Sequence, residues 1–397
     1  MMASLNILFL TAYLPVLGVH GGGMRMFHNL KVLSQKHRLT LLSFIESESE
    51  RECLPQLEEL GVEVKAVLRR PSTANHLLVP KPREHDEYHS SQMAALVRET
   101  LAERRFDVVQ AEFLQMGQHV PRHLPIFKIL TEHEVHYANL HADFRAETRP
   151  FGKVKKFYDW MVQLNYEVKV CQGFDRIVCM TDEDLKVLSE FVPSAKLTRI
   201  PIGVDSDYFQ PRQSLTELPP RRRLLFVGNY RHPPNREAVN YFASEILPLI
   251  HRVLPDVEFW VVGANGDMLD RRALSETGKI NVIGYAKDIR TFYQEASIFV
   301  APIRSGSGMR VKLLEAFSMG MAVVASPLAT YGFSVKNEEH LLQALTPESF
   351  AAQTIRLLQD PSLQLKLGFK ARKLIQEHYD WKVIEPQLLE LAESKHV

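Results

Sequence analysis

Two cations and a carboxylate follow a short loop of Gly and Ser near residue 310. In "FVAPIRSGSGMRVKLLEA" an apolar run stops in this loop, and Arg310 and Lys312 then open a helical pattern that carries Glu315. Cations in the first turn of a helix face the positive end of its dipole, so an anion bound there would explain them. Lys312 and Glu315 share one helix face. An ordinary surface ion pair would use the same side chains, but their place after a strand and a Gly-Ser loop favours an anion site.

Three consecutive glycines follow the first apolar run. They are Gly21, Gly22 and Gly23 in "VHGGGMR", and a helical pattern comes after them. Glycine lets the backbone approach a ligand closely, and the N–H groups at a helix start suit an anion, although a flexible connector is the other explanation. The spacing is not G-x-G-x-x-G, which argues against a dinucleotide fold. A ligand with a diphosphate and a hydroxylated ring would need the set found near residue 310: N–H groups and cations for the phosphates, and the carboxylate of Glu315 for the hydroxyl groups.

Apolar runs rich in Val, Ile and Phe alternate with helical patterns along the chain, which is typical of βαβ units and parallel sheets. The first half holds "NILFLTAY", "HRLTLLSFI", "FDVVQAEF", "IFKILTEHE" and "FDRIVCMT", and the second holds "RLLFVGNY", "VEFWVVGANG", "KINVIGYA", "SIFVAP" and "AVVAS". A Pro-rich stretch from 199 to 223 is predicted to be a linker. The pattern predicts an α/β protein of two halves that bind ligands where the strands end.

The composition excludes several classes of protein. The chain has 397 residues, 45% of them hydrophobic, which suits two globular domains. A formal net charge of +1 gives no overall attraction to nucleic acid. The scattered cysteines Cys53, Cys171 and Cys179 fit neither a disulfide framework nor a zinc site. The N-terminus lacks the basic start of a signal peptide, and no apolar run approaches the ~20 residues of a membrane span, so we expect a cytoplasmic protein.

Several stretches resemble glycosyltransferase family 4, in the order in which that family has them. The segment "FVAPIRSGSGMRVKLLEAFSMGMAVVASPLATYGF" looks like its donor-binding segment, and "PVLGVHGGGMR" looks like its N-terminal glycine loop. Further similar elements are "RIPIGVDSDYF", "LLFVGNYRHPPNREAVNYF", "INVIGYAKDIRTFYQEASIFVAP" and "HYDWKVI". The resemblance covers nearly the whole chain, and it is specific for the class of enzyme but not for any one substrate.

The resemblance implies the GT-B fold, with two Rossmann-like parallel-sheet domains that face a central cleft. We expect an N-terminal acceptor-side domain over residues 1–205, a C-terminal nucleotide-sugar-binding domain over residues 206–377, and a last helix over residues 378–397 that crosses back to the N-terminal domain. The implied activity is transfer of a sugar, with retention of anomeric configuration, from a nucleotide sugar to a saccharide or lipid-linked acceptor. Such a reaction belongs to the synthesis of cell-surface polysaccharide or glycoconjugate. The nucleotide sugar is a co-substrate, and no cofactor is expected.

The resemblance also assigns candidate site residues. Arg310 and Lys312 would neutralise the leaving diphosphate, and Glu315 would hold hydroxyl groups of the ribose or the sugar. His133, in "TEHEVHY", would contact the donor sugar near its anomeric carbon. The predicted donor-binding residues are Gly22, Gly23, Gly228, Arg231, Tyr285, Ser307, Gly308 and Met309. Because Ser307 stands where many members carry the first Glu of a Glu-x7-Glu pair, a catalytically idle nucleotide-sugar-binding or scaffold protein of the same fold is the alternative.

No metal site is predicted. Asp205 and Asp207 form a "DSD" that looks like the Asp-x-Asp of metal-dependent sugar transferases, but the family match places it in a structural interdomain element. His133, His136 and His141 are close in sequence, although their spacing matches neither H-E-x-x-H nor another zinc pattern. We therefore expect transfer without a bound metal ion.

A basic helical pattern, "RPFGKVKKFYDWMVQLNYEVKV", runs from Arg149 to Val170. It mixes Lys153, Lys155 and Lys156 with aromatic residues, which suits a membrane surface or an anionic lipid carrier. A surface helix with an ordinary apolar face explains the same residues. The sequence leaves both explanations open, and under the first the protein would be peripheral at the inner face of the membrane.

Overall fold

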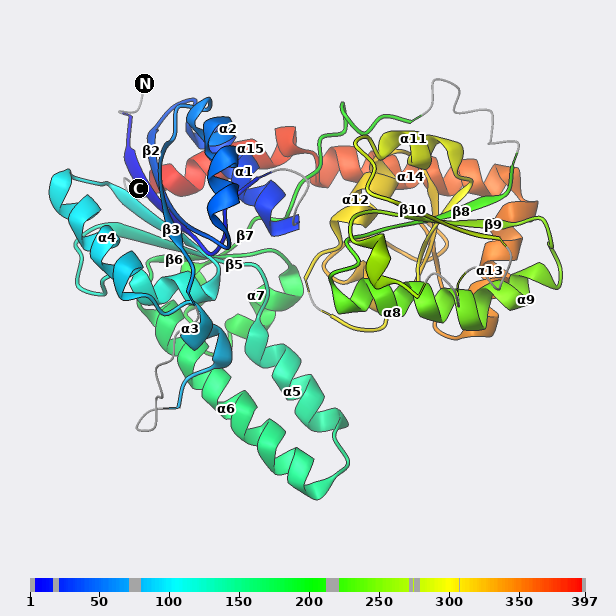
Figure 1. The fold of residues 1–397 in the computed structure, drawn as a ribbon, viewed down its shortest axis with the longest axis horizontal. Coiled ribbons are helices and arrows are strands. Elements are labelled where there is room, and N and C mark those ends of the chain that lie inside the picture. Colours follow the sequence, from blue (N-terminus) through cyan, green and yellow to red (C-terminus); the bar gives the residue numbers. More distant parts are fainter. Residues whose placement is uncertain are drawn as a thin grey trace. The chain divides into compact units, whose positions relative to one another are not determined.

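The computed structural model describes residues 4–16, 21–70, 80–211, 221–270, 274, 279–306 and 308–394. The chain divides into two compact units. The first unit takes in the residues up to Pro201 and those from Glu385 onward, and the second is Ile202–Ile384. Each unit has one parallel sheet packed with helices (Figure 1). The predicted α/β class with two Rossmann-like parallel-sheet domains is confirmed.

The sheet of the first unit has seven strands in the order β3-β2-β1-β4-β5-β6-β7. The strands are β1 (Asn6–Thr11), β2 (Arg38–Ile45), β3 (Glu63–Leu68), β4 (Val108–Glu112), β5 (Phe127–Glu132), β6 (Arg176–Cys179) and β7 (Leu197–Arg199). The helices are α1 (Gly21–Leu33), α2 (Leu54–Glu58), α3 (Arg83–Glu87), α4 (Ser91–Glu103), α5 (His136–Ala146), α6 (Pro150–Gln172) and α7 (Asp182–Leu188), and a short 3-10 helix, η2 (Leu114–His119), follows β4. Nearly every side chain of β1 and β4 is buried, as expected for strands covered on both faces.

The sheet of the second unit has six strands in the order β10-β9-β8-β11-β12-β13. The strands are β8 (Arg223–Val227), β9 (Glu258–Val262), β10 (Ile280–Gly284), β11 (Ile298–Ala301), β12 (Ala322–Ala325) and β13 (Leu342–Gln343). The helices are α8 (Pro233–Tyr241), α9 (Leu247–His251), α11 (Arg290–Glu295), α12 (Val311–Ser318), α13 (Pro347–Gln359) and α14 (Pro361–His378). A π-helical turn, Phe242–Ile246, joins α8 to α9. The fully buried β11 and β12 are the apolar runs that the sequence indicates.

Both sheets reverse their strand order beside the first strand of the unit. In the first unit β1 lies between β2 and β4, and in the second unit β8 lies between β9 and β11. Parallel α/β sheets bind ligands outside the carboxyl ends of the strands at such a switch point. The loops that follow β4, β8 and β11 are therefore the expected ligand-binding positions.

The end of the chain forms α15 (Trp381–Glu393), which starts three residues after α14 ends. Tyr379 lies between the two helices and leaves the helical conformation, with φ −129° and ψ 3°. Two contacts hold the end of α15 in the first unit: Glu385 lies 3.0 Å from Nε2 of His28, and Glu393 lies 3.8 Å from Nε2 of His37. No helix in the described ranges is long and apolar enough to cross a membrane.

Candidate functional site

The Gly-Ser stretch of the second unit forms the loop between β11 and α12. The helix begins at Val311, and Arg310 is its N-cap. Gly306 and Gly308 have φ values of +86° and +76°, a left-handed conformation that glycine adopts most readily. Ser307 lies outside the described residues. The loop leads from the end of a buried strand to a helix start whose first N–H groups have no partner inside the helix.

Lys312 lies in the first turn of α12 and is only partly exposed. Its Nζ donates a hydrogen bond to Oδ1 of Asn235 at 2.6 Å and lies 4.3 Å from the centre of the Phe226 ring. Burial lowers the pKa of Lys312 to about 7, and the charge of Arg310 acts in the same direction. Without a ligand the amine is therefore poorly solvated, and a bound anion would stabilise its charged form.

Glu315 lies one turn further along α12 and is buried. The hydroxyl of Tyr293, from α11, donates a hydrogen bond of 2.8 Å to Oε2 of Glu315. Burial raises the pKa of Glu315 to about 7, against the opposing effects of Tyr293 and Lys312. The structure thus brings a carboxyl group and an amine, both titrating near neutral pH, to the start of one helix at the carboxyl end of the sheet.

Arg310 turns back onto its own loop. Its Nη2 donates to the carbonyl oxygen of Gly306 at 2.8 Å and lies 3.4 Å from that of Ser305. In this conformation the guanidinium group holds the Gly-Ser loop in place. A direct contact of Arg310 with phosphate stays a prediction.

The other predicted donor-binding residues of the second unit lie in three different environments. A Cβ at Gly228 would lie 3.2 Å from Nζ of Lys312 and 3.0 Å from the side chain of Asn235, so the glycine leaves room for that pair. Arg231 and Tyr285 are exposed, Tyr285 to 74%, in the segments that follow β8 and β10. The remaining two, Gly308 and Met309, lie half-buried in the loop before α12.

In the first unit, His133 directly follows β5. Its Nε2 lies 2.9 Å from Oε2 of Glu112, the buried last residue of β4, and its ring stacks on Phe113 with centroids 3.7 Å apart. Burial lowers the pKa of His133, although Glu112 opposes this effect. For Glu112, burial acts to raise the pKa, but the hydrogen bond from His133 and the charges of His133 and Arg25 outweigh it and lower the pKa. The ionised Glu112 accepts a hydrogen bond from Nε2–H of His133, so Nδ1 of the neutral ring is left as an acceptor.

Gly22 is packed beside this histidine. It lies in the first turn of α1, as does Gly23, so these glycines open the helix. A Cβ at Gly22 would lie 2.4 Å from the hydroxyl of Tyr13, 2.9 Å from the ring of Phe113 and 3.4 Å from Nδ1 of His133. Only a residue without a side chain fits here unless the aromatic neighbours move. The structure therefore brings together Gly22 and His133, which the sequence singled out separately.

The "DSD" residues contact the backbone of their own turn and one lysine of α15. Oδ1 of Asp205 accepts hydrogen bonds from the backbone N–H groups of Asp207 and Tyr208, at 3.0 and 2.9 Å. Asp207 pairs with Nζ of Lys382 at 2.5 Å. His141 stacks on Trp160 at 4.5 Å. Within the described ranges no three His, Cys, Asp or Glu side chains are grouped so that they could hold a metal ion.

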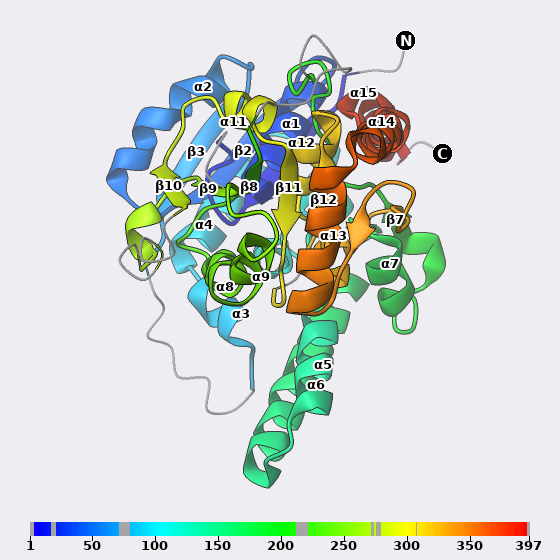
Figure 2. The same ribbon diagram turned by 90° about the vertical axis from the view of Figure 1, so that its right-hand side faces the viewer.

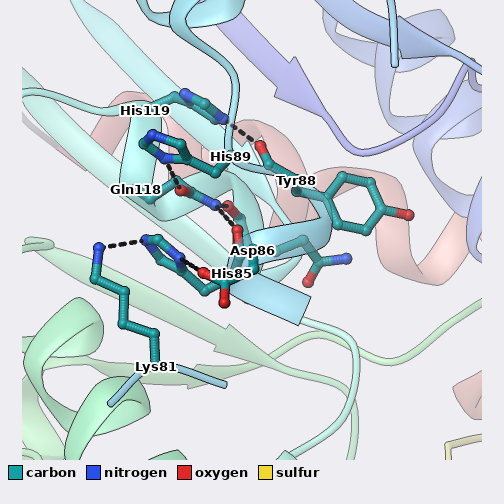
Figure 3. Close-up of polar contacts among 8 residues, drawn as sticks. Lys81, His85, Asp86, Tyr88, His89, Gln118 and His119 are labelled. Atoms are coloured by element: carbon teal, nitrogen blue, oxygen red, sulfur yellow. Dashed lines mark hydrogen bonds and ion pairs between the residues drawn. The ribbon is translucent and has the colours of Figure 1, made fainter. Parts of the chain in front are cut away.

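A polar network fixes the segment after residue 80 against η2, at the carboxyl end of β4 (Figure 3). Nε2 of His119 lies 2.9 Å from the carbonyl oxygen of Tyr88, and His89 contacts Oε1 of Gln118 at 3.1 Å. Nε2 of Gln118 donates to the carbonyl oxygen of His85 at 3.1 Å. Burial lowers the pKa of His119 to about 4, so this ring is neutral at pH 7. The sequence alone indicated no structure for this segment.

Comparison with known families gives a consistent result for both units. The family described as "Glycosyltransferase Family 4" matches residues 50–208, and "Glycosyl transferases group 1" matches residues 221–360. The chain belongs to glycosyltransferase family 4. The predicted resemblance is therefore confirmed, and the two parallel-sheet units are those of the GT-B fold.

Individual relatives of this family 4 chain are distant. An uncharacterized 44.6 kDa protein in the cps region of Klebsiella pneumoniae is 26% identical over 267 residues, which are 65% of this chain and 66% of that protein. A phosphatidyl-myo-inositol mannosyltransferase of Mycolicibacterium smegmatis is 31% identical over 202 residues, 49% of this chain and 51% of that enzyme. The chain thus spans about half the length of this mannosyltransferase. The Anabaena protein HepE in complex with UDP has the same fold, with a TM-score of 0.71. The match covers 98% of this chain and 100% of HepE, at 12% sequence identity.

Three site residues of this family 4 chain escaped the sequence prediction. Asn235 and Tyr293 orient the ends of Lys312 and Glu315, and Glu112 orients His133. A signal existed for Asn235, because "PPN" after a strand is part of the family resemblance. Tyr293 and Glu112 had none, since an aromatic residue in a helix and a polar residue ending a strand are common in any α/β protein.

Proposed function

We propose that the protein is a retaining glycosyltransferase that moves a sugar from a nucleotide sugar to a saccharide or lipid-linked acceptor. The start of α12 supports this proposal most strongly. An amine poised near neutral pH, an oriented carboxyl group and a helix N-terminus lie together there, which are the groups that a diphosphate and a sugar or ribose ring require. Membership of family 4 gives the reaction class. The UDP bound by HepE and the lipid acceptor in the name of the mycobacterial relative fit the same proposal.

In this proposal Lys312 stabilises the charge that develops on the leaving diphosphate. A preorganised cation in a poorly hydrated site does so with little rearrangement, because its surroundings are already oriented by Asn235. Glu315, held by Tyr293, would accept hydrogen bonds from hydroxyl groups of the donor. Arg310 would act by ordering the Gly-Ser loop and, if it turns outward, on the phosphates themselves.

From the first unit, His133 is proposed to contact the donor sugar near its anomeric carbon. Its Nδ1 is available as an acceptor because Glu112 engages Nε2. Gly22 packs against Tyr13, Phe113 and this histidine. With Gly23 it is proposed to let the start of α1 approach the donor phosphates. No protein nucleophile is proposed.

We further propose that the reaction needs neither a cofactor nor a metal ion, since Lys312 and the start of α12 supply the positive charge. Turnover should then survive an excess of EDTA. Asp205→Ala should lower the thermal stability by removing a cap from two backbone N–H groups, typically about 1 kcal/mol, and leave the rate nearly unchanged. Loss of turnover in EDTA that manganese restores would contradict this proposal.

The second candidate is an idle nucleotide-sugar-binding protein of the same fold. The observation in its favour is Ser307 at the place of the first Glu of the family pair. A screen of nucleotide release over UDP-, GDP-, ADP- and dTDP-sugars, with ligand-induced thermal shifts measured in parallel, separates the two. A thermal shift with a donor but no release of nucleotide, either by hydrolysis or with any acceptor, would support the idle protein.

The proposed place of action is the cytoplasm, at the inner face of the membrane, where nucleotide sugars and lipid-linked acceptors meet. The proposed biological role is the synthesis of cell-surface polysaccharide or glycoconjugate, which the cps region named for the Klebsiella relative also fits. No nucleic acid partner is proposed.

A further inference from the structure

Two helices of the first unit form a hairpin that extends away from its sheet. Figures 1 and 2 show α5 and α6 side by side, with the turn between them at the far end. The hairpin has a core of its own: Trp160 stacks on His141 at 4.5 Å and on Phe144 at 5.9 Å, and Phe157 packs edge-on against Trp160 at 5.7 Å. Aromatic contacts therefore join the two helices.

The outer surface of α6 carries a stripe of apolar side chains. Phe151, Val154, Tyr158 and Met161 follow at spacings of three and four residues, which puts them on one face of the helix. Their exposed fractions are 93%, 71%, 54% and 41%, in that order. Exposure is thus greatest at the turn and falls toward the body of the unit. Large apolar side chains exposed in one patch indicate an interaction surface.

Positive charge surrounds the same end of the hairpin. Between 143 and 161 the chain has five cations, Arg145, Arg149, Lys153, Lys155 and Lys156, and three carboxylates, Asp143, Glu147 and Asp159. Glu147 pairs with Lys156 at 3.2 Å, which leaves four cations and two carboxylates outside this pair. Arg149 and Lys155 are exposed beside the apolar stripe. We call residues 145–161 the hairpin tip.

We propose that the hairpin tip docks on the surface of a bilayer that contains anionic lipids. Aromatic and aliphatic side chains would enter the boundary between headgroups and acyl chains, while the cations around them would meet lipid phosphates. The start of α6 adds the positive end of a helix dipole at the same place. Of the four side chains of the stripe, Phe151 would enter the bilayer first, because it is the most exposed and lies next to the turn.

The charge distribution favours a bilayer over a second copy of the chain. A dimer through the stripe would bring the exposed cations of two tips together, which costs free energy, whereas an anionic surface neutralises them. The fall in exposure away from the turn also fits contact by the end of the hairpin better than contact along its side. This surface is independent of the start of α12, so the proposal does not rest on the proposed reaction.

The test is co-sedimentation of the full-length protein with vesicles of phosphatidylcholine alone and of phosphatidylcholine with about one third phosphatidylglycerol. We expect binding to the anionic vesicles, weakened by salt, and little binding to the neutral ones. The double variant Phe151→Ser with Val154→Ser and the double variant Arg149→Glu with Lys155→Glu should each lower the partition coefficient at least tenfold. Circular dichroism and thermal unfolding should match the wild type, because all four side chains are exposed.

The matched control is Phe369→Ser with Lys366→Glu, an exposed apolar residue and an exposed cation on α14. It should bind the anionic vesicles like the wild type. Equal binding to neutral and anionic vesicles, or wild-type binding by both tip variants, would overturn the proposal. So would a dimer, detected by sedimentation equilibrium without lipid, that the Phe151→Ser and Val154→Ser variant abolishes while vesicle binding is absent throughout.

Discussion

Replacement of Lys312 by methionine should weaken the binding of a nucleoside diphosphate by about 1.5–3 kcal/mol, or roughly 10- to 150-fold. The side chain that remains can still pack on Phe226, but the charged hydrogen-bond donor is lost. Turnover should fall at least as far, because the charge on the diphosphate grows as the bond to the sugar breaks. Isothermal titration with UDP and GDP and a steady-state rate would measure the two effects.

The affinity of the wild-type protein should also depend on pH. The pKa of Lys312 without a ligand is about 7, and a bound diphosphate would raise it by favouring the charged amine. Below pH 7 the amine is already charged, so the affinity is full. Above pH 7 the free protein must take up a proton on binding, so the affinity should fall with rising pH, by at most about tenfold per pH unit. In Lys312→Met the part of this dependence that comes from the lysine should disappear.

Two further variants test the assignment to Lys312. Glu315→Gln removes the other group whose pKa lies near 7. Any change of diphosphate affinity with pH that remains in this variant therefore comes from Lys312. Asn235→Ala should weaken diphosphate binding less than Lys312→Met, because it disturbs the position of the amine and keeps the charge. Lys366→Met, on the exposed surface of α14, is the control for loss of one charge. Unchanged affinity in both Lys312→Met and Arg310→Ala would disprove the phosphate site.

A second large effect is expected at the other unit. His133→Ala should lower kcat on the order of 100- to 1,000-fold, the usual cost of removing one polar group at a reacting centre. The affinity for a nucleoside diphosphate should stay within about twofold of the wild type, because the diphosphate is proposed to bind at the start of α12, whereas His133 is proposed to contact the sugar. Titration with a nucleoside diphosphate and single-turnover rates with the best donor would show whether the rate falls while the affinity is kept.

Glu112→Gln tests how the histidine is positioned. The substitution keeps the shape of the side chain but allows it to donate a hydrogen bond to Nε2, which would move the imidazole proton to Nδ1. An intermediate loss in kcat and a shifted pH profile are expected. His123→Ala, at an exposed position of the same unit, should change nothing. If His133→Ala lost diphosphate affinity and rate in equal measure, a role in general folding would explain it better than contact with the sugar.

The fold could be predicted from the sequence because apolar runs alternate with helical patterns along the chain, and each such pattern can be recognised locally. Apolar runs such as "IFVAP" and "AVVAS" form the buried strands β11 and β12, and helical patterns fall between strands as expected. Lys312 and Glu315 were likewise predictable, since a helix start and a spacing of three residues fix their relation. The N-terminus of α12 itself follows the two glycines of its loop, as predicted.

Contacts between distant segments were not predictable in the same way. Asn235 meets Lys312 across 77 positions of sequence, and Tyr293 meets Glu315 across 22, so no local period reveals either pair. Arg310 donates a hydrogen bond to the carbonyl oxygen of Gly306, and no local period in the sequence reveals the left-handed conformation of that glycine. For the segment 80–90 the sequence offered no pattern, because its order comes from hydrogen bonds to η2.

The first unit is discontinuous along the chain, since it needs both the residues up to Pro201 and those from Glu385 onward. During synthesis the ribosome therefore releases the whole of Ile202–Ile384 before the last piece of the first unit appears. The second unit is complete in sequence by then and can fold as a block, whereas the surface around His28 and His37 stays uncovered until α15 emerges. Nascent chains that stall before residue 385 would thus carry a second unit that is complete in sequence and a first unit that still lacks its last segment.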